Sequence, residues 1–196
     1  MNKHSMKDVE AKLGFLKTQI SPHVLFNTLS FIKYAVKHEP QMAQEAVDRL
    51  ADLLSYGIYQ DASLFTSLEN EVEKINHIIA LQEMRYDKKQ NFLFKLDCPC
   101  AEIQIIPLVI IGIIENFFKH GNLMVKNYQA KIEITCSLGY LSLVTENKIA
   151  RGFSQVESGN GLSLMRERLS LAYKGDYALE YGESEDVFKT FLKIPI

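Results

Sequence analysis

The hydrophobic pattern at the beginning of the chain is helical. Apolar residues recur every three or four positions over residues 13–24 and, after a shift, over residues 29–36, which predicts one long helix. Pro22 lies inside this helix and removes one backbone donor, so we expect a kink or a loosened turn just before His23. Glu39-Pro40 then ends the helix.

Two more helices are predicted before the pattern changes. An apolar face runs through residues 41–59, and Thr66-Ser67-Leu68-Glu69 has the form of a capping box that starts a third helix, which reaches Tyr86. Two consecutive amphipathic helices joined by a short loop cannot bury both apolar stripes by themselves, whereas a four-helix bundle made by two chains buries them. The pattern therefore favours a homodimer.

After Tyr86 the period becomes that of strands. Strands are expected at residues 92–96, 103–106, 131–136, 140–145, 177–181 and 187–194, and helices at residues 107–121 and 162–173. A tight turn at Leu138-Gly139 joins two of the strands. This order predicts an α+β fold with helices on one face of a mixed sheet, and a domain boundary within residues 84–90.

Composition narrows the class of protein. Apolar residues make up 47% and charged residues 23% of the 196 residues, which is typical of a globular chain, and the net charge of −2 offers no basic face for nucleic acid. The longest apolar run, residues 103–114, is shorter than the roughly 20 residues of a membrane helix, and the charged N-terminus is not a signal peptide. We expect a cytoplasmic chain, joined to a membrane only through a segment that is absent from it.

The three cysteines, Cys98, Cys100 and Cys136, are an odd number. This count suits a reducing compartment better than a disulfide framework. Cys98-Pro-Cys100 lacks the two-residue spacing of zinc knuckles and redox pairs, so a metal role is not expected.

A first group of residues that could carry chemistry lies within residues 19–29. His23 and Asn27 are four residues apart and share a helix face. A solvent-facing imidazole can act as a nucleophile while a nearby amide orients it. The alternative interpretation is a surface histidine on a bundle helix.

A second group follows the long apolar run. Asn116, Lys119 and His120 face one way on a helix, and an amide oxygen suits Mg²⁺, while the two basic side chains could neutralise phosphate. The alternative is a polar helix end, where Lys and His are favourable.

A third group leads into the helix expected at residues 162–173. Gly159 and Gly161 would let backbone N–H groups approach a phosphate at the positive end of that helix. Glycines also serve ordinary turns, so the pair by itself is weak evidence.

Together these strings resemble LytS/YesM-type bacterial sensor histidine kinases. Residues 19–29 resemble the phospho-acceptor box, residues 107–121 the N box, and residues 158–169 the second glycine box of that family. The chain departs from the acceptor box at Ser21 and Val24, where Asn and Phe are common.

Further departures affect the nucleotide site. In the N box, Ile111-Gly112 replaces the usual Gln-Pro, and Phe117 replaces a small Ala, so that its ring could pack into the core or crowd the nucleotide site. The first glycine box is lost within residues 144–150, where Asn147 takes the adenine-binding position of the family's Asp, with Glu146 as the rival. The late Gly-Thr pair has become Lys189-Thr190.

The resemblance implies a helical dimerisation and phospho-acceptor hairpin at residues 1–86, then a GHKL (Bergerat-type) α/β sandwich at residues 87–196. It implies a histidine kinase that uses ATP and Mg²⁺ to phosphorylate itself and then an aspartate on a response-regulator receiver domain. The implied catalytic residues are His23, Asn27 and Glu115. The implied nucleotide-binding residues are Asn116, which would also bind Mg²⁺, and Lys119, His120, Asn147, Gly159, Gly161 and Leu162.

Two other functions stay open at this point. One is a non-catalytic dimerisation and docking module that kept the fold and lost ATP turnover. The other is a GHKL ATPase that uses nucleotide as a conformational switch without phosphorylating His23. Nucleotide binding and formation of phosphohistidine distinguish the three.

Overall fold

The computed structural model describes residues 22–59, 65–87, 89–100, 102–150 and 160–196. The expected helix over residues 13–21 and the kink near Thr18 lie outside these ranges. In chain order the elements are α2 (Pro22–His38), α3 (Pro40–Tyr59), β1 (Thr66–Ser67), α4 (Leu68–Arg85), β2 (Phe92–Asp97), β3 (Gln104–Ile105), α5 (Val109–His120), β4 (Ala130–Ser137), β5 (Tyr140–Lys148), α6 (Asn160–Tyr173), β6 (Ala178–Ser184) and β7 (Val187–Pro195). No helix in the described part of the chain has the length and apolar character needed to cross a membrane.

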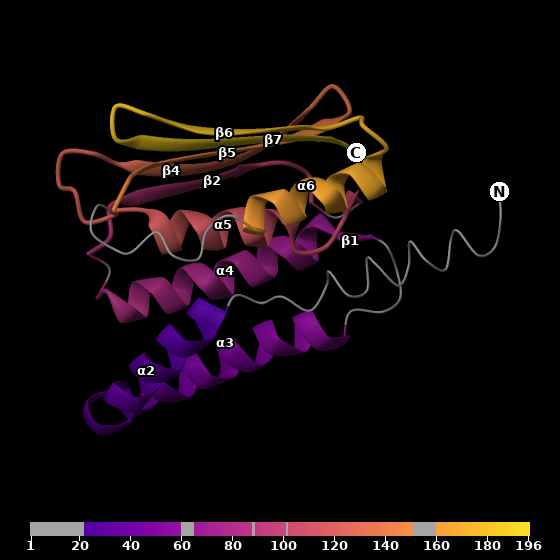
Figure 1. Ribbon diagram of the computed structural model, residues 1–196. Helices are drawn as coiled ribbons and strands as arrows, with labels where there is room; N and C mark the ends of the chain where they lie inside the picture. The colour runs from indigo at the N-terminus through magenta and orange to yellow at the C-terminus, as the bar shows by residue number, and fades with distance from the viewer. Residues whose placement is uncertain (1–21, 60–64, 88, 101, 151–159) are drawn as a thin grey trace.

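The fold has three layers (Figure 1). A five-stranded sheet in the order β2-β4-β5-β7-β6 forms one outer layer, α4, α5 and α6 lie on one face of it, and the α2–α3 hairpin lies beyond α4. The β2–β4 pair is parallel and the other pairs are antiparallel. The predicted α+β fold with a mixed sheet is therefore confirmed.

Burial alternates along the central strand β5. Leu141, Leu143, Thr145 and Asn147 are buried towards the helices, while Glu146 lies on the opposite face. This alternation assigns each polar residue near the end of β5 to one side of the sheet.

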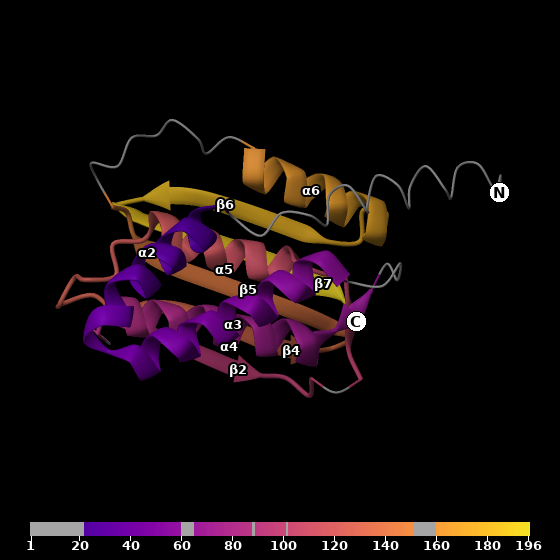
Figure 2. The ribbon, with the colours of Figure 1, turned by 90° about the horizontal axis from the view of Figure 1, so that it is seen from below.

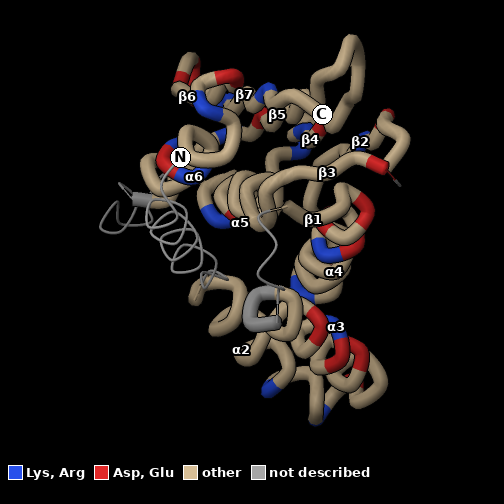
Figure 3. The backbone as a smooth tube through the Cα atoms, turned by 90° about the vertical axis from the view of Figure 1, so that its right-hand side faces the viewer, with Lys and Arg blue, Asp and Glu red and all other residues tan. Residues whose placement is uncertain are grey.

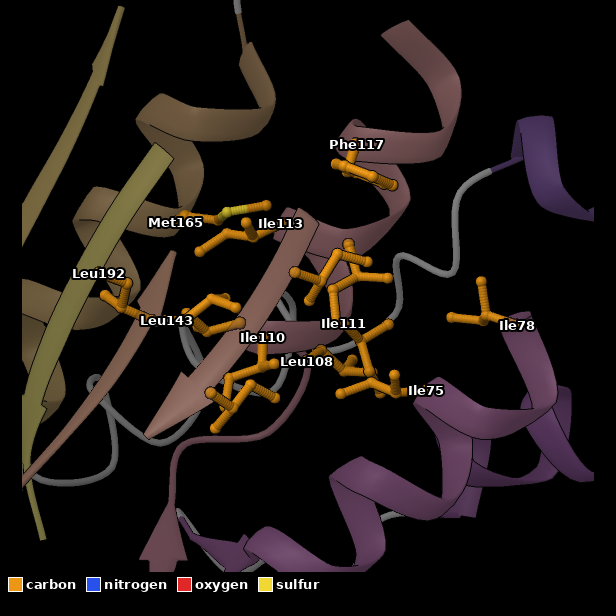
Figure 4. Packing of buried hydrophobic residues seen from close by; sticks show 14 of the residues in the cluster. Ile75, Ile78, Leu108, Ile110, Ile111, Ile113, Phe117, Leu143, Met165 and Leu192 are labelled. Atoms are coloured by element: carbon orange, nitrogen blue, oxygen red, sulfur yellow. The ribbon is translucent and has the colours of Figure 1, made fainter. Parts of the chain in front are cut away.

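The core is centred on α5, which carries few charged positions (Figure 3). Its Ile110 and Ile113 are buried between the helices and the sheet residues Leu143 and Leu192, and Ile75 of α4 closes the other side (Figure 4). Because α4 shares this core, residues on both sides of the division expected at 86/87 pack together. The domain division itself stays a prediction.

The start of α5 differs from the expectation. The helix begins at Val109 rather than Pro107, and Leu108 before it has a left-handed backbone, with φ of 66° and no capping side chain of its own. A non-glycine residue in this conformation is uncommon and is held in place by surrounding contacts. The third predicted helix also starts one residue late, because Ser67 rather than Thr66 is the N-cap of α4.

The cysteine expectation was wrong for two of the three residues. Cys98, just after β2, is joined by a disulfide to Cys136 of β4, and Cys100 is free. The parallel register explains the pairing, because Asp97 lies opposite Thr135 and the next residues on the two strands are therefore neighbours.

The α2–α3 hairpin keeps apolar side chains exposed. Phe26, Leu29, Tyr34 and Val36 of α2 and Val47 of α3 are all largely accessible. Viewed from below, the hairpin lies in front of the sandwich, and the first turn of α2 lies over α5 (Figure 2).

Candidate functional site

His23 is in the first turn of α2 and is half-buried. Its Nε2 lies 2.8 Å from Nδ2 of Asn27, one turn further along the helix, as the spacing predicted. A neutral ring protonated at Nδ1 accepts the amide N–H at Nε2. The amide therefore fixes the orientation of the imidazole.

The surroundings of His23 lower the pKa of its imidazole from the ordinary value of 6.5. Burial is the largest cause, followed by the positive charges of Arg85 and Lys119 and then by His120. Lys119 and His120 are the last residues of α5, so the acceptor helix and the N-box helix of the same chain approach each other here. A neutral imidazole keeps a lone pair available for attack on phosphorus.

Arg85 lies near His23, although the motifs did not identify it. It ends α4, and together with Asn27, Thr28 and Gln82 it lines a small crevice between α2 and α4. No spacing pattern connects residue 85 to residue 23, so only the packing of α4 against α2 reveals it.

Helix α5 places the N-box residues at two depths. Glu115 is buried, whereas Asn116, Lys119 and His120 are half-buried on the more open side. Burial and the neighbouring Lys119 lower the pKa of His120. The three polar residues therefore share a face at the C-terminal part of α5, as expected from their spacing.

Phe117 points into the core. Its side chain is 2% exposed, and its ring makes edge-to-face contacts with Phe118 at 5.2 Å and with Phe92 at 6.2 Å between centroids. Of the two possibilities left open by the sequence, the structure has the ring packed in the core (Figure 4).

The two candidates for the adenine position lie on opposite faces of the sheet. Asn147 is 1% exposed and faces the helices, where a Cβ added to Gly121 would lie 3.2 Å from its Nδ2. Glu146 faces away and accepts hydrogen bonds from Tyr128 at 2.7 Å and from Lys189 at 2.9 Å. Only Asn147 is on the same side of the sheet as α5.

Thr190 of β7 joins Asn147 on the inner face. It is buried and pairs across the sheet with Thr145, which precedes Asn147 by two residues on the same face. In the sequence, residues 189–190 were of interest only because they replace the family's Gly-Thr pair. The strand register shows that Thr190 nevertheless lies on the inner face of the sheet.

The second glycine box is described from residue 160 onwards, so Gly159 lies outside the described residues. Gly161, in the first turn of α6, is exposed, and a Cβ added to it would lie 3.9 Å from the amide nitrogen of Asn116. Leu162 packs against the core. The start of α6 and Asn116 are therefore neighbours, as a shared phosphate site requires.

The donor set near Asn116 suits a magnesium ion held mainly by other ligands. The described residues contain no group of three or more His, Cys, Asp or Glu side chains that could hold a metal. Mg²⁺ commonly binds one or two protein oxygens together with waters and substrate phosphates. One amide oxygen from Asn116 fits that mode of binding. It does not fit a site in which protein side chains supply all the ligands.

Comparison with known proteins gives matches along most of the chain. The family model described as histidine kinase matches residues 11–90. Sensor protein LytS of Staphylococcus epidermidis is 23% identical over 194 residues, covering 92% of this chain and 32% of that protein. Sensor histidine kinase BtsS of Escherichia coli K12 is 22% identical over 190 residues, covering 95% of this chain and 34% of that protein.

This chain therefore spans about a third of the length of these two relatives. Among solved structures, the catalytic domain of histidine kinase ThkA in a nucleotide-free form aligns with a TM-score of 0.50 and 16% identity. The alignment covers 67% of this chain and 97% of that domain. At this identity the likeness concerns the fold.

Proposed function

We propose that this chain, a LytS-type sensor histidine kinase by its family-model match and its curated relatives, catalyses transfer of the γ-phosphoryl group of ATP to His23. The phosphoryl group then passes to an aspartate on the receiver domain of a response regulator. The part of the relatives that this chain does not span would contain the membrane anchor, and this chain would act in the cytoplasm.

The observation that supports the proposal most directly is the closeness of His23 to the charged end of α5. His23, held by Asn27 with a lowered imidazole pKa, lies within the electrostatic influence of Lys119 and His120. Two elements that the sequence linked to phosphoryl transfer by separate motifs are thus neighbours in one chain.

Each residue of the site has a separate role in the in-line transfer of the phosphoryl group. Once the Asn27 amide gives way, the Nε2 lone pair of His23 forms the new bond to the γ-phosphorus while the bond to the β–γ bridging oxygen breaks; ADP leaves with that electron pair, and the Nδ1 proton passes to solvent. Asn27 orients the imidazole, and Lys119 and His120 offset the negative charge of the phosphoryl oxygens. Asn116 would hold Mg²⁺, which neutralises phosphate charge when bound.

Nucleotide binding would use the inner face of the sheet and the start of α6. Asn147 presents an amide where the resemblance implies an adenine contact, and Gly161 lies beside Asn116. Glu115 is buried behind Asn116, so we assign it a role through the helix rather than by direct contact.

The exposed apolar side chains of the hairpin support a homodimer. Phe26, Leu29 and Val36 lie along one side of α2, and a second copy of the hairpin would bury them in a four-helix bundle.

The test is incubation with γ-labelled ATP and Mg²⁺. The wild type should acquire acid-labile, base-stable label, and His23→Gln and Asn116→Ala should not. His38→Gln is the matched control, because His38 ends the same helix and is exposed. Label that survives His23→Gln, or that His38→Gln abolishes, would contradict the assignment.

The second candidate is the non-catalytic dimerisation and docking module. The observation in its favour is Asn147, because a neutral amide binds an amino group less strongly than a carboxylate does. A stable dimer without label at saturating ATP would favour this candidate. ATP hydrolysis that persists in His23→Gln would instead favour the nucleotide-switch ATPase.

A further inference from the structure

A buried carboxyl group lies where four helices meet. Glu71 of α4 is fully buried, and its Oε1 accepts hydrogen bonds from the backbone N–H of Leu108 at 2.7 Å and from the hydroxyl of Tyr56 at 2.6 Å. Its Oε2 lies 3.4 Å from the backbone nitrogen of Ile111. No step of the proposed phosphoryl transfer uses this residue.

The two backbone contacts make Glu71 the N-terminal cap of α5. Leu108 has a left-handed backbone and provides no capping side chain, so the first N–H groups of the helix need a partner from elsewhere. An acidic side chain also suits the positive end of a helix. Glu71 thus fixes the position of the helix that carries Asn116, Lys119 and His120.

A second buried side chain holds the same turn from the other side. Arg168 of α6 donates through Nη2 to the carbonyl of Pro107 at 2.6 Å, and its charge acts on Glu71. The hydroxyl of Tyr173 accepts from the backbone nitrogen of Ile106 at 3.3 Å. The turn before α5 is therefore anchored by α4 and α6 together.

The contact from Tyr56 is of a different kind, because Tyr56 belongs to the hairpin. It is near the end of α3, which packs along α2, the helix that carries His23. Polar contacts join the hairpin to the rest of the chain here. The Tyr56–Glu71 hydrogen bond, at 2.6 Å, is shorter than the Tyr56–Thr66 contact at 3.5 Å and the Asp52–His77 separation of 3.9 Å.

We propose that Glu71 is a positioning residue that holds the nucleotide-binding helix and the phospho-acceptor hairpin to one common point, with the Tyr56 hydroxyl as a releasable latch. The inference rests on the proposed function for its catalytic consequence. When the hairpin moves away, Glu71 keeps its two backbone partners and α5 stays capped, but water can reach the amides of Leu108 and Ile111, which then exchange more readily. The hydroxyl of Tyr56 then bonds to water, so release leaves no buried polar group unpaired.

Tyr56→Phe tests the latch because it removes one oxygen and keeps the ring. A single net hydrogen bond shifts a two-state equilibrium by about three- to tenfold, so hydrogen exchange at the Leu108 and Ile111 amides should accelerate by that factor. Tyr34→Phe, which removes an exposed hydroxyl on α2, is the matched control and should leave both rates unchanged. Ile132, a fully buried residue of the inner strand β4, reports global unfolding.

Acceleration at Leu108 and Ile111 without acceleration at Ile132 supports the latch. Equal rates in Tyr56→Phe and Tyr34→Phe, or a parallel increase at Ile132, would overturn it. Glu71→Gln is the second variant, because it replaces one acceptor oxygen of the carboxylate by an amide nitrogen and should accelerate exchange at Ile111 as well. These measurements need no nucleotide, so they remain decisive even where nucleotide binding fails.

Autophosphorylation kinetics then test the positioning role. In Tyr56→Phe the hairpin is released while the cap remains, so kcat should fall about three- to tenfold with KM for ATP within about twofold. In Glu71→Gln, which disturbs α5 itself, KM should rise as well. A KM effect without a kcat effect in Tyr56→Phe would contradict the latch, whereas absence of label in the wild type would contradict only the proposed function.

Discussion

Replacement of Phe117 by alanine tests whether this unusual residue of the N box belongs to the core. The ring is 2% exposed and packs edge-to-face against Phe92 and Phe118. Truncation of a buried phenylalanine costs about 3–5 kcal/mol, because both the transfer free energy and the packing around the ring are lost. We expect the free energy of unfolding to fall by about that amount.

The same loss can be expressed as a change in melting temperature. The entropy of unfolding is about 2.1 cal/mol/K per residue, so a chain of 196 residues should melt about 7–12 °C lower. Urea denaturation followed by circular dichroism gives the free energy, and thermal melting gives an independent check. Leu93→Ala, at a half-exposed position on the outer face of β2, is the control and should change stability by less than about 1 kcal/mol.

Two results would refute the interpretation. A loss below about 1 kcal/mol in Phe117→Ala would mean that the ring is not a core element. A gain in ATP affinity of tenfold or more at unchanged stability would mean that the ring occupies nucleotide space. The second result would mean that the Phe117 ring weakens nucleotide binding by crowding the site.

Three further expectations follow from the site and from the cap of α4. The pKa values of His23, His77 and His120 are lowered in the folded chain, so the unfolded chain binds more protons below about pH 6.5, and the free energy of unfolding should decrease as the pH falls through that range. Asn147→Asp buries a charge, so it should lower stability by about 1–3 kcal/mol and raise ATP affinity, measured by denaturation and by nucleotide titration. Ser67→Ala removes the side chain that accepts from the third amide of α4 and should cost about 0.5–2 kcal/mol in urea denaturation.

Each expectation has an outcome that contradicts it. Burial raises the pKa of the Glu71 carboxyl and so works in the opposite direction; stability that still rises on acidification below about pH 6.5 in Glu71→Gln would mean that the three imidazoles gain protons on folding. If both ATP affinity and stability fall in Asn147→Asp, residue 147 does not contact the adenine base. An unchanged urea midpoint in Ser67→Ala would show that the cap is replaced by water.

The periodicity of the sequence predicted most of the elements because their apolar positions reflect burial. The alternation at residues 140–145 identified β5, and the stripe over residues 41–59 identified α3 almost to its ends. The strand order was not predictable, because pairing of β5 with β7 depends on contacts between segments far apart in the sequence. The cap of α5 was missed for the same reason, since Glu71 acts on Leu108 across the core.

The candidate site was predictable where a motif lies within one helix. His23 and Asn27 have the expected contact because four residues make one turn. The choice between Glu146 and Asn147 needed the orientation of β5, and Arg85 became visible only from the packing of α4 beside α2. The motifs of the resemblance suggested the role of each residue, and the tertiary contacts showed which residues lie beside it.

The place of β7 in the sheet has a consequence for folding. The β4–β5 hairpin closes through the two-residue turn at Leu138-Gly139, and such local pairings form within microseconds. Strand β7 is last in chain order, yet it lies between β5 and β6. During synthesis the edge of β5 therefore stays open until residues 187–195 have left the ribosome. A nascent chain at that stage exposes an unpaired central strand, which is the point at which it is most prone to pair with another chain.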